Sequence, residues 1–277
     1  MSKAKALLKL TRPQNNLITA ISVFIGAWVC GDIPSWGKMI LACFSASLIS
    51  SGGYVINDYF DVEIDRVNKP LRPLVGGEIS KGKALILSLI LFSLGLFLSF
   101  VIGLSAVLLA LFSILALVYY SYRLKRVLFW GNFLVSLICA LAFVYGGIVG
   151  EDFRWSLIPA TFAYLFHLGR EILKDVEDKE GDRLSSAKTI PIVLGVRPSL
   201  FFISFIFSIL ILLTLFPYIF KILSISYLLT VFLFDLLLVY ILWSMWKDWS
   251  YKNLGRLSRI LKVDMILGLV AIFLGKL

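Results

Sequence analysis

Long apolar segments separated by short polar stretches dominate the pattern of this 277-residue chain. A helix that crosses a membrane needs about twenty mostly apolar residues, and nine segments meet that requirement. They are centred near Val23, Ala46, Leu94, Leu111, Cys139, Phe162, Ser208, Phe232 and Leu267. The pattern therefore predicts an all-α fold, a polytopic membrane bundle of nine transmembrane helices around a central cavity, with residues 1–277 forming a single domain.

The amino-acid composition is that of a protein embedded in a lipid bilayer. Hydrophobic residues make up 60% of it, charged residues only 16%, and the mean hydropathy is +0.93. These values lie outside the range of ordinary soluble domains. The net charge of +10 does not indicate nucleic acid, because the basic residues are scattered between apolar segments instead of forming one basic face.

Lys and Arg residues orient the predicted helices, because cytoplasmic loops collect them. With the N-terminus in the cytoplasm, only four of the 27 basic residues fall outside, namely Lys38, Arg154, Lys221 and Lys276. We therefore expect a multi-pass protein of the cell membrane with a cytoplasmic N-terminus and an external C-terminus. The basic start, residues 1–12, is expected to lie on the membrane surface as a short amphipathic helix before a retained first span.

Two acidic motifs with one spacing follow the second and sixth predicted spans. Asp58, Asp61 and Asp65 are spaced i, i+3, i+7, and so are Asp175, Asp178 and Asp182. On a helix each trio lines one face. We call them the first and second ladders. Both fall on the cytoplasmic side of the predicted topology, so we expect them to face each other across one cavity and form a site there.

Six clustered carboxylates repel one another unless cations lie between them. Mg²⁺ prefers oxygen ligands and commonly bridges carboxylates to substrate phosphates, so two ions fit two ladders. Two Mg²⁺ and a diphosphate still leave the cluster negative, and basic partners are needed. Candidates are Lys69, Arg72, Arg123, Lys125, Arg126, Arg170 and Lys174. Ordinary solvated charges at a helix end would explain one acidic cluster. Two clusters with the same spacing, both on the predicted cytoplasmic side of the membrane, favour a functional site instead. Similar flanks, such as Asp65-Arg66 and Asp182-Arg183, also suggest an internal duplication.

The extended motifs resemble those of the UbiA superfamily of intramembrane prenyltransferases. The resemblance rests on Asn57-Asp58-x-x-Asp61-x-x-x-Asp65, its continuation through Arg66, Asn68, Lys69, Pro70, Arg72 and Pro73, and the second ladder. Arg12-Pro13 with Asn16, and Lys125-Arg126 followed by Gly131-Asn132, extend it along the chain. The resemblance implies two Mg²⁺ ions, a polyprenyl diphosphate donor and transfer of the prenyl group to an acceptor.

Site roles follow from this resemblance, position by position. The implied metal ligands are Asn57, Asp61, Asp65, Asp178 and Asp182, with Asp58 and Asp175 as supporting ligands. Asp61, Asp65, Asp178 and Asp182 are also the implied catalytic residues, because the metal ions that they hold take part in the reaction. The implied diphosphate contacts are Lys69, Arg72, Lys125, Arg126 and Lys174. Asn16 and Tyr122 are expected to bind substrate, Tyr122 by stabilising a cation with its ring; the alternative for Tyr122 is a simple role at the membrane interface.

The acceptor is predicted from weaker motifs. Family members that prenylate 4-hydroxybenzoate typically carry Lys-Arg-x-Thr-x-x-Pro-Gln, whereas here Lys125-Arg126 continues into Val127-Leu128-Phe129-Trp130. The segments 72–80 and 169–178 are most similar to those of the archaeal digeranylgeranylglyceryl phosphate synthases, a branch of this family. That similarity implies geranylgeranyl diphosphate as donor and the hydroxyl of geranylgeranylglyceryl phosphate, a lipid phosphate, as acceptor.

Other functions remain open at this point. The same mechanism can serve an aromatic acceptor of the quinone or tetrapyrrole type. A cation transporter is an alternative of another class, although transporters usually place their acids near the bilayer midplane. Two further ionisable residues lie in apolar segments: His167 is expected to be packed, and Asp235 either bonds a neighbouring helix or reaches the cavity.

Overall fold

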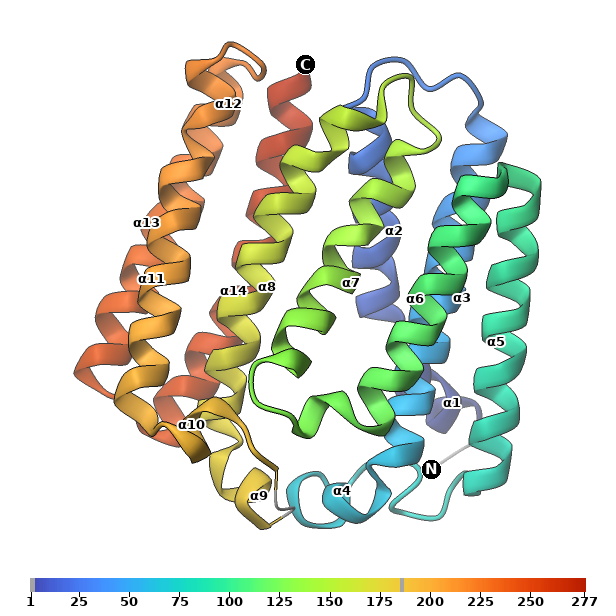
Figure 1. The fold of residues 1–277 in the computed structure, drawn as a ribbon, viewed down its shortest axis with the longest axis vertical. Helices are drawn as coiled ribbons and strands as arrows, with labels where there is room; N and C mark the ends of the chain where they lie inside the picture. The colour runs from blue at the N-terminus through green and yellow to red at the C-terminus, as the bar shows by residue number, and fades with distance from the viewer. Residues whose placement is uncertain (1–2, 185–186) are drawn as a thin grey trace. The chain divides into compact units, whose positions relative to one another are not determined.

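A computed structural model describes residues 3–184 and 187–277, which contain helices and no strands. The elements are α1 (Lys3–Thr11), α2 (Pro13–Trp28), α3 (Trp36–Phe60), α4 (Val62–Asn68), α5 (Lys81–Ile102), α6 (Leu104–Tyr122), η1 (Leu124–Arg126), α7 (Trp130–Gly147), η2 (Phe153–Ser156), α8 (Leu157–Glu177), α9 (Lys179–Leu184), α10 (Ile190–Val193), α11 (Val196–Thr214), α12 (Phe216–Ile219), α13 (Ile225–Lys247) and α14 (Tyr251–Lys276). Figure 1 shows their order along the chain. The all-α prediction is confirmed.

Every predicted span centre falls inside a long helix, in the order α2, α3, α5, α6, α7, α8, α11, α13 and α14. Among the residues that the structure describes, six segments are long and apolar enough to cross a membrane: Trp36–Phe60, Lys81–Ile102, Leu104–Tyr122, Trp130–Gly147, Val196–Ile219 and Ile225–Lys247. The 16 residues of α2 rise only about 24 Å, and α8 and α14 carry several charged residues. The multi-pass membrane protein is confirmed, and the count of nine crossings stays a prediction.

Serine side chains mark where three of the long helices begin. Ser35, Ser80 and Ser250 accept hydrogen bonds from backbone N–H groups three residues later, at the starts of α3, α5 and α14. Such caps satisfy amide groups that have no partner inside the helix. Local sequence therefore fixes these helix starts independently of the packing between helices.

The chain divides into two compact units, and α7 contributes residues to both. Unit 1 is Met1–Lys125 with Leu141–Phe153. Its central helix α3 packs against α2, α5 and α6. The second half of α7 approaches α2 closely, because a Cβ atom at Gly146 would lie 1.8 Å from the carbonyl oxygen of Val23. Glycine is the residue that allows this contact between helix backbones.

The N-terminal helix α1 is anchored within unit 1. Ala6 and Leu10 are fully buried in a small core with Val55, Leu74 and Ile79, and the Lys9 ammonium group donates to the carbonyl oxygen of Leu71. The expected amphipathic helix at the start of the chain is therefore present. It packs against the segment after α4 and so holds the stretch that carries Arg72.

Unit 2 is Arg126–Ala140 with Arg154–Leu277. Within it α8 packs against α11 and α14, and α13 packs against α14. A Cβ atom at Gly169 of α8 would lie 2.3 Å from the Phe207 ring of α11, which shows how closely these helices approach. Asp235 of α13 accepts a hydrogen bond of 3.0 Å from the Thr214 hydroxyl of α11, so the expected bond to a neighbouring helix is confirmed.

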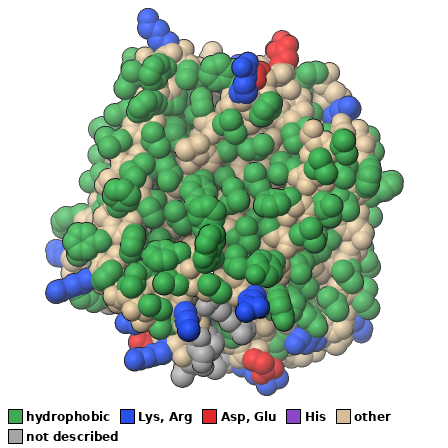
Figure 2. All heavy atoms as spheres, in the orientation of Figure 1, with side chains coloured by type: hydrophobic (Ala, Val, Ile, Leu, Met, Phe, Trp, Pro, Cys, Tyr) green, Lys and Arg blue, Asp and Glu red, His purple; other side chains and the backbone are tan. Residues whose placement is uncertain are grey.

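Hydrophobic side chains cover much of the exposed helix surface (Figure 2), while Lys, Arg, Asp and Glu side chains gather near the helix ends. Phe97, Phe100, Leu104, Phe201 and Leu229 are each at least 65% exposed. A surface of this kind is unfavourable in water and suits a bilayer.

Candidate active site

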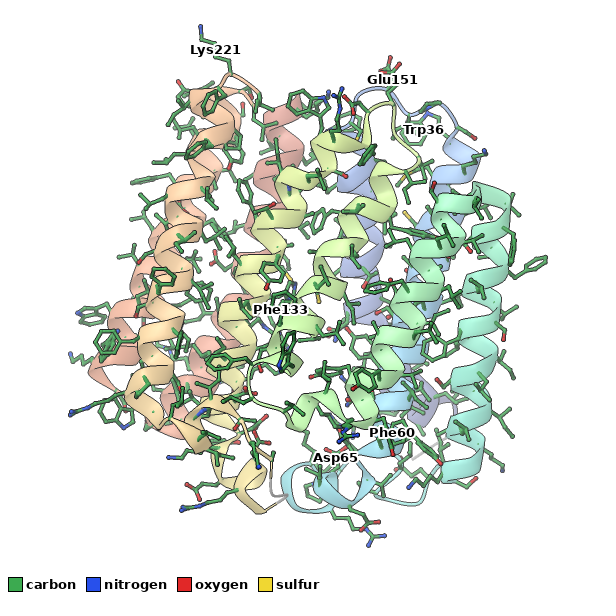
Figure 3. All side chains as sticks on the ribbon, viewed as in Figure 1. Trp36, Phe60, Asp65, Phe133, Glu151 and Lys221 are labelled. Carbon is green, nitrogen blue, oxygen red and sulfur yellow. The ribbon has the colours of Figure 1, made fainter. Side chains whose placement is uncertain are left out.

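The first ladder lies where α3 gives way to α4 in unit 1. Asp58 is in the last turn of α3, Asp61 is the single residue between the two helices, and Asp65 is in α4. The backbone amide of Asp61 donates to Asn57 O at 3.0 Å, and that of Asp65 donates to Asp61 O at 2.8 Å. In Figure 3, Asp65 lies beside Phe60 at one end of α3, and Trp36 lies at the opposite end. The helical hydrogen-bond pattern expected at this spacing is confirmed, but the three carboxylates lie on two helices and the residue between them, not on one face of a single helix.

Three cations from distant segments pair with the first ladder. Arg12 donates to Asp58 at 2.5 Å. Arg72 donates to Asp58 at 2.8 Å and also to Asp65. Lys125 pairs with Asp61. Because Asp58 and Asp65 are 3% and 4% exposed, these pairs replace the water that ionised carboxylates require. The expectation that basic partners accompany the ladder is confirmed in unit 1.

Arg12 is the partner that sequence reasoning missed as a site residue. It sits between α1 and α2 with φ 51° and ψ 64°, in the left-handed region that larger residues rarely adopt. Its guanidinium group lies 4.7 Å from the centre of the Tyr54 ring. The signal that could have indicated it is the Arg12-Pro13 pair at the start of the first apolar run, since proline favours a helix start.

The other predicted residues of unit 1 divide into two groups. Asn57 lies at the ladder and donates to Asp61 Oδ2 at 2.9 Å, and Lys69 adds a positive charge near Asp58. Asn16 instead donates to Ser51 Oγ at 2.6 Å and to Thr11 O at 2.8 Å, contacts that join α2 to its neighbours. Tyr122 is 63% exposed and contacts the Phe60 ring. The structure does not bring Asn16 into the group of ion pairs.

Burial dominates the electrostatics of Asp65, which lies in α4 outside the membrane-spanning segments. Loss of hydration raises the pKa of Asp65 to about 6, although the neighbouring Arg72 guanidinium lowers it. The repulsion from Asp61 and Asp58 raises the pKa further. Asp65 is therefore largely ionised at neutral pH but gains its proton more readily than an ordinary aspartate.

The second ladder repeats the local architecture of the first within unit 2. Asp175 is in the last turns of α8, Asp178 is the single residue between α8 and α9, and Asp182 is in α9. The amide of Asp178 donates to Lys174 O at 2.7 Å, and that of Asp182 donates to Asp178 O at 3.0 Å. In both ladders the middle aspartate separates a long helix from a short one. The predicted similarity of the two segments therefore extends to their backbone.

The side-chain partners of the second ladder differ in kind. Asp175 accepts a hydrogen bond of 2.8 Å from the neutral side chain of Asn132 in α7. Lys174, expected at a diphosphate, pairs with Glu171 at 2.8 Å, and Arg170 pairs with the same carboxylate at 2.9 Å. Neither Glu171 nor Asn132 was predicted from the sequence to be a site residue. The side chain of Arg126, another expected contact, lies outside the described residues.

The donor set suits Mg²⁺ in its chemistry. Each ladder offers carboxylate oxygens, and Asn57 adds an amide oxygen, all of them ligands that hard cations prefer. In the described part of the chain, however, no three His, Cys, Asp or Glu side chains form a group that could hold a metal ion. In the first ladder Arg and Lys groups contact the oxygens instead. Lys125 contacts Oδ1 of Asp61 and Arg72 contacts Oδ2 of Asp65, so a metal ion at these carboxylates would either share them with the two cations or displace the cations.

Comparison with known proteins gives consistent matches along the chain. Residues 19–260 match the UbiA prenyltransferase family. The digeranylgeranylglyceryl phosphate synthase of Methanosphaera stadtmanae is 33% identical over 270 residues, which are 98% of this chain and 98% of that relative. A solved structure of a digeranylgeranylglyceryl phosphate synthase is 34% identical, has a TM-score of 0.81 and is matched over 100% of this chain and 99% of that one.

A more distant solved structure shares the fold. It is a UbiA homologue from Archaeoglobus fulgidus bound to GPP and Mg²⁺, 20% identical, with a TM-score of 0.69 and coverage of 96% of this chain and 99% of that one. The family inferred from the two ladders is therefore the same as the family that residues 19–260 match. The chain belongs to the UbiA prenyltransferase family.

Proposed function

We propose that this protein transfers the geranylgeranyl group of geranylgeranyl diphosphate to the hydroxyl of geranylgeranylglyceryl phosphate, forming an ether lipid precursor. The relative from M. stadtmanae, matched over nearly its full length, carries the name of that synthase, and so does the solved structure with the same degree of identity. The observation that supports the chemistry most directly is the first ladder with its cations Arg12, Arg72 and Lys125.

We propose Mg²⁺ as the cofactor, with two ions bound. The ligands are the carboxylates of Asp61, Asp65, Asp178 and Asp182 with the amide oxygen of Asn57, and Asp58 and Asp175 support them. Oxygen-only ligation is what Mg²⁺ requires, and the homologue from A. fulgidus was solved with GPP and Mg²⁺. The bound ions supply Lewis acidity at the diphosphate oxygens.

The side chains of the first ladder exchange partners in this proposal. Arg72 and Lys125 contact Asp58, Asp61 and Asp65 in the structure. With these carboxylates holding metal, the guanidinium group of Arg72 and the ammonium group of Lys125 would be available to contact the diphosphate. There they stabilise the negative charge that grows on the leaving group while the allylic carbon–oxygen bond breaks. The acceptor oxygen then forms the new bond to that carbon, and the proton of its hydroxyl passes to the released diphosphate. Lys69 and Arg126 are further proposed contacts.

Apolar helices protect the reaction from water in this mechanism. An allylic carbon that has lost its diphosphate reacts with water unless the acceptor reaches it first. Helices α3 and α6 of unit 1, which consist largely of apolar residues, supply a dry environment for this carbon and for the prenyl tail.

We propose that residues 1–277 act as one transmembrane domain with nine crossings, the N-terminus and the ladders on the cytoplasmic side and the C-terminus outside. The uneven distribution of Lys and Arg supports this orientation. Reporter fusions after α2, α8 and α14 would test the three crossings that are shorter or more polar than the other six. A cytoplasmic reporter signal after α14 would contradict the topology.

The decisive experiment supplies the purified protein with Mg²⁺, geranylgeranyl diphosphate and geranylgeranylglyceryl phosphate. We expect release of diphosphate together with the doubly prenylated glyceryl phosphate, identified by mass spectrometry. Turnover on a phenol with none on the glyceryl phosphate would overturn the acceptor. Ion flux into liposomes in the absence of any prenyl diphosphate would favour a transporter.

A further inference from the structure

Two cations of α8 are bound to a carboxylate that belongs to neither ladder. Arg170 and Lys174 both donate to Glu171, at 2.9 Å and 2.8 Å. The three side chains together carry one positive charge in excess. Those of Arg170 and Glu171 are only 14% and 13% exposed. The Nε–H group of Arg170 is buried and has no hydrogen-bond partner among the residues that the structure describes.

These cations share a face of α8 with the second ladder. Arg170, Lys174 and Asp178 follow one another at intervals of four residues, so they lie along one side of the helix. The opposite side is apolar: Gly169 packs against Phe207 of α11, and Leu173 is fully buried. Lys174 and Arg170 thus lie about 6 and 12 Å along the axis from Asp178. The ladder and the excess positive charge form one polar stripe.

A buried positive charge with an unused N–H group favours an anionic ligand. Leaving such a group without a partner costs free energy, and a guanidinium group with a neighbouring ammonium group suits a phosphate, with arginine providing several donors in fixed geometry. The cations of the first ladder already contact carboxylates of that ladder. The carboxylate that Arg170 and Lys174 contact, Glu171, is not a proposed metal ligand.

The proposed reaction has a second phosphate besides the diphosphate. In a glyceryl phosphate lipid the reacting hydroxyl and the phosphate belong to the same three-carbon unit, so the phosphate must bind within a few ångströms of the carbon that is attacked. A cationic site one to two helical turns from a metal ligand meets this requirement.

We infer that Arg170 and Lys174 bind the phosphate group of the lipid acceptor and that Glu171 is a positioning residue that holds both cations beside the second ladder. The inference rests on the proposed function and specifies how the acceptor is selected. Lys174 accordingly serves the acceptor phosphate and not the diphosphate. Selection for a phosphorylated acceptor then depends on α8.

The test compares two acceptors, geranylgeranylglyceryl phosphate and its dephosphorylated form, geranylgeranylglycerol, in full-length protein with Mg²⁺. For Arg170→Gln we expect the KM for the phosphorylated acceptor to rise about tenfold or more, because one charged partner of the phosphate is lost. The KM for the donor stays within about twofold, since its metal ligands are unchanged. The preference in kcat/KM for the phosphorylated acceptor falls by the same tenfold factor.

Three further variants sharpen the test. Arg170→Lys retains the charge and should restore part of the preference. Glu171→Gln removes the carboxylate that holds both cations in place and should lower the preference in the same direction as Arg170→Gln. Lys252→Gln removes an exposed charge at the start of α14 and should leave the KM for each of the two acceptors unchanged. If Arg170→Gln does not fold, Lys174→Gln, at a site 35% exposed, provides the same comparison.

The outcomes separate this inference from the function on which it rests. Wild-type turnover on the phosphorylated acceptor, with an unchanged preference in Arg170→Gln and Lys174→Gln, would overturn the inference alone. If the variants lose kcat/KM equally on both acceptors, or if the KM for the donor rises, the inference is overturned as well. Failure of the wild-type protein to prenylate either glycerol acceptor would overturn both proposals.

Discussion

The ammonium group of Lys125 pairs with the carboxylate of Asp61, although 64 residues separate them in the chain. Asp61 is the residue between α3 and α4, and Lys125 lies in η1, directly after α6. Both side chains are mostly buried, with 12% and 14% exposed. The pair neutralises negative charge at the centre of the first ladder.

Replacing Asp61 should abolish turnover without unfolding the protein. In Asp61→Asn the carboxylate proposed to bind metal becomes a neutral amide, and we expect kcat to fall by a factor of about 100 or more. Asp182→Asn should have a similar effect. Diphosphate release and the melting temperature in detergent measure the two properties. Asp32→Asn changes an exposed aspartate and should alter neither turnover nor the melting temperature. Unimpaired turnover in Asp61→Asn would show that the reaction does not depend on metal bound by Asp61.

Loss of the Arg72 side chain should destabilise unit 1. Arg72→Gln leaves Asp58 and Asp65 with weaker partners in buried positions, and removing one partner of a buried ion pair costs about 3–5 kcal/mol. Arg66→Gln is the matched control, because its pair with Glu63 at 3.0 Å is exposed on both sides and such pairs contribute about 1 kcal/mol or less. Denaturant unfolding in detergent compares them. Equal losses of unfolding free energy in the two variants would show that burial of the Arg72 ion pairs adds little to stability.

Stability should depend on pH through Asp65. The pKa of Asp65 is raised from 3.8 to about 6 on folding, so between these values the folded protein binds more protons than the unfolded chain. Its unfolding free energy therefore rises as the pH falls from 6 towards 4, by up to about 1.4 kcal/mol per pH unit from this group. Comparing wild type with Asp65→Asn in the absence of metal isolates the effect. A difference that is constant over this range, or of opposite sign, would contradict the assignment.

The contact between α2 and the second half of α7 should tolerate no side chain at Gly146. In Gly146→Ala the new methyl group would lie 1.8 Å from the Val23 carbonyl oxygen, so the helices must separate, and we expect a loss of about 1–3 kcal/mol. Gly82→Ala is a suitable control, because nothing lies within 4 Å of the added atom. That change should be neutral or slightly stabilising. Thermal unfolding of the two variants measures the contrast.

Within the ladders, sequence alone predicted the backbone and the carboxylates but only some of the partners. The spacing of Asp58, Asp61 and Asp65 is a local property of a helix, and the structure confirms it. Arg72 and Lys125 were expected near a diphosphate and are found on the carboxylates. The pairing of Arg12 with Asp58 and of Asn132 with Asp175 could not be predicted from local spacing, since 46 and 43 residues separate the partners.

The sequence by itself determined the membrane environment, the positions of the long helices and the two acidic ladders. These features depend on apolar run length and on residue spacing within a few helical turns, both of which can be counted along the chain. Tertiary structure decided which cation neutralises which carboxylate of the first ladder, and that Asn132 of α7 bonds Asp175 of α8. The physical reason is that electrostatic energy depends on distance and burial, and those are set by the path of the loops and by the packing of helices remote in sequence.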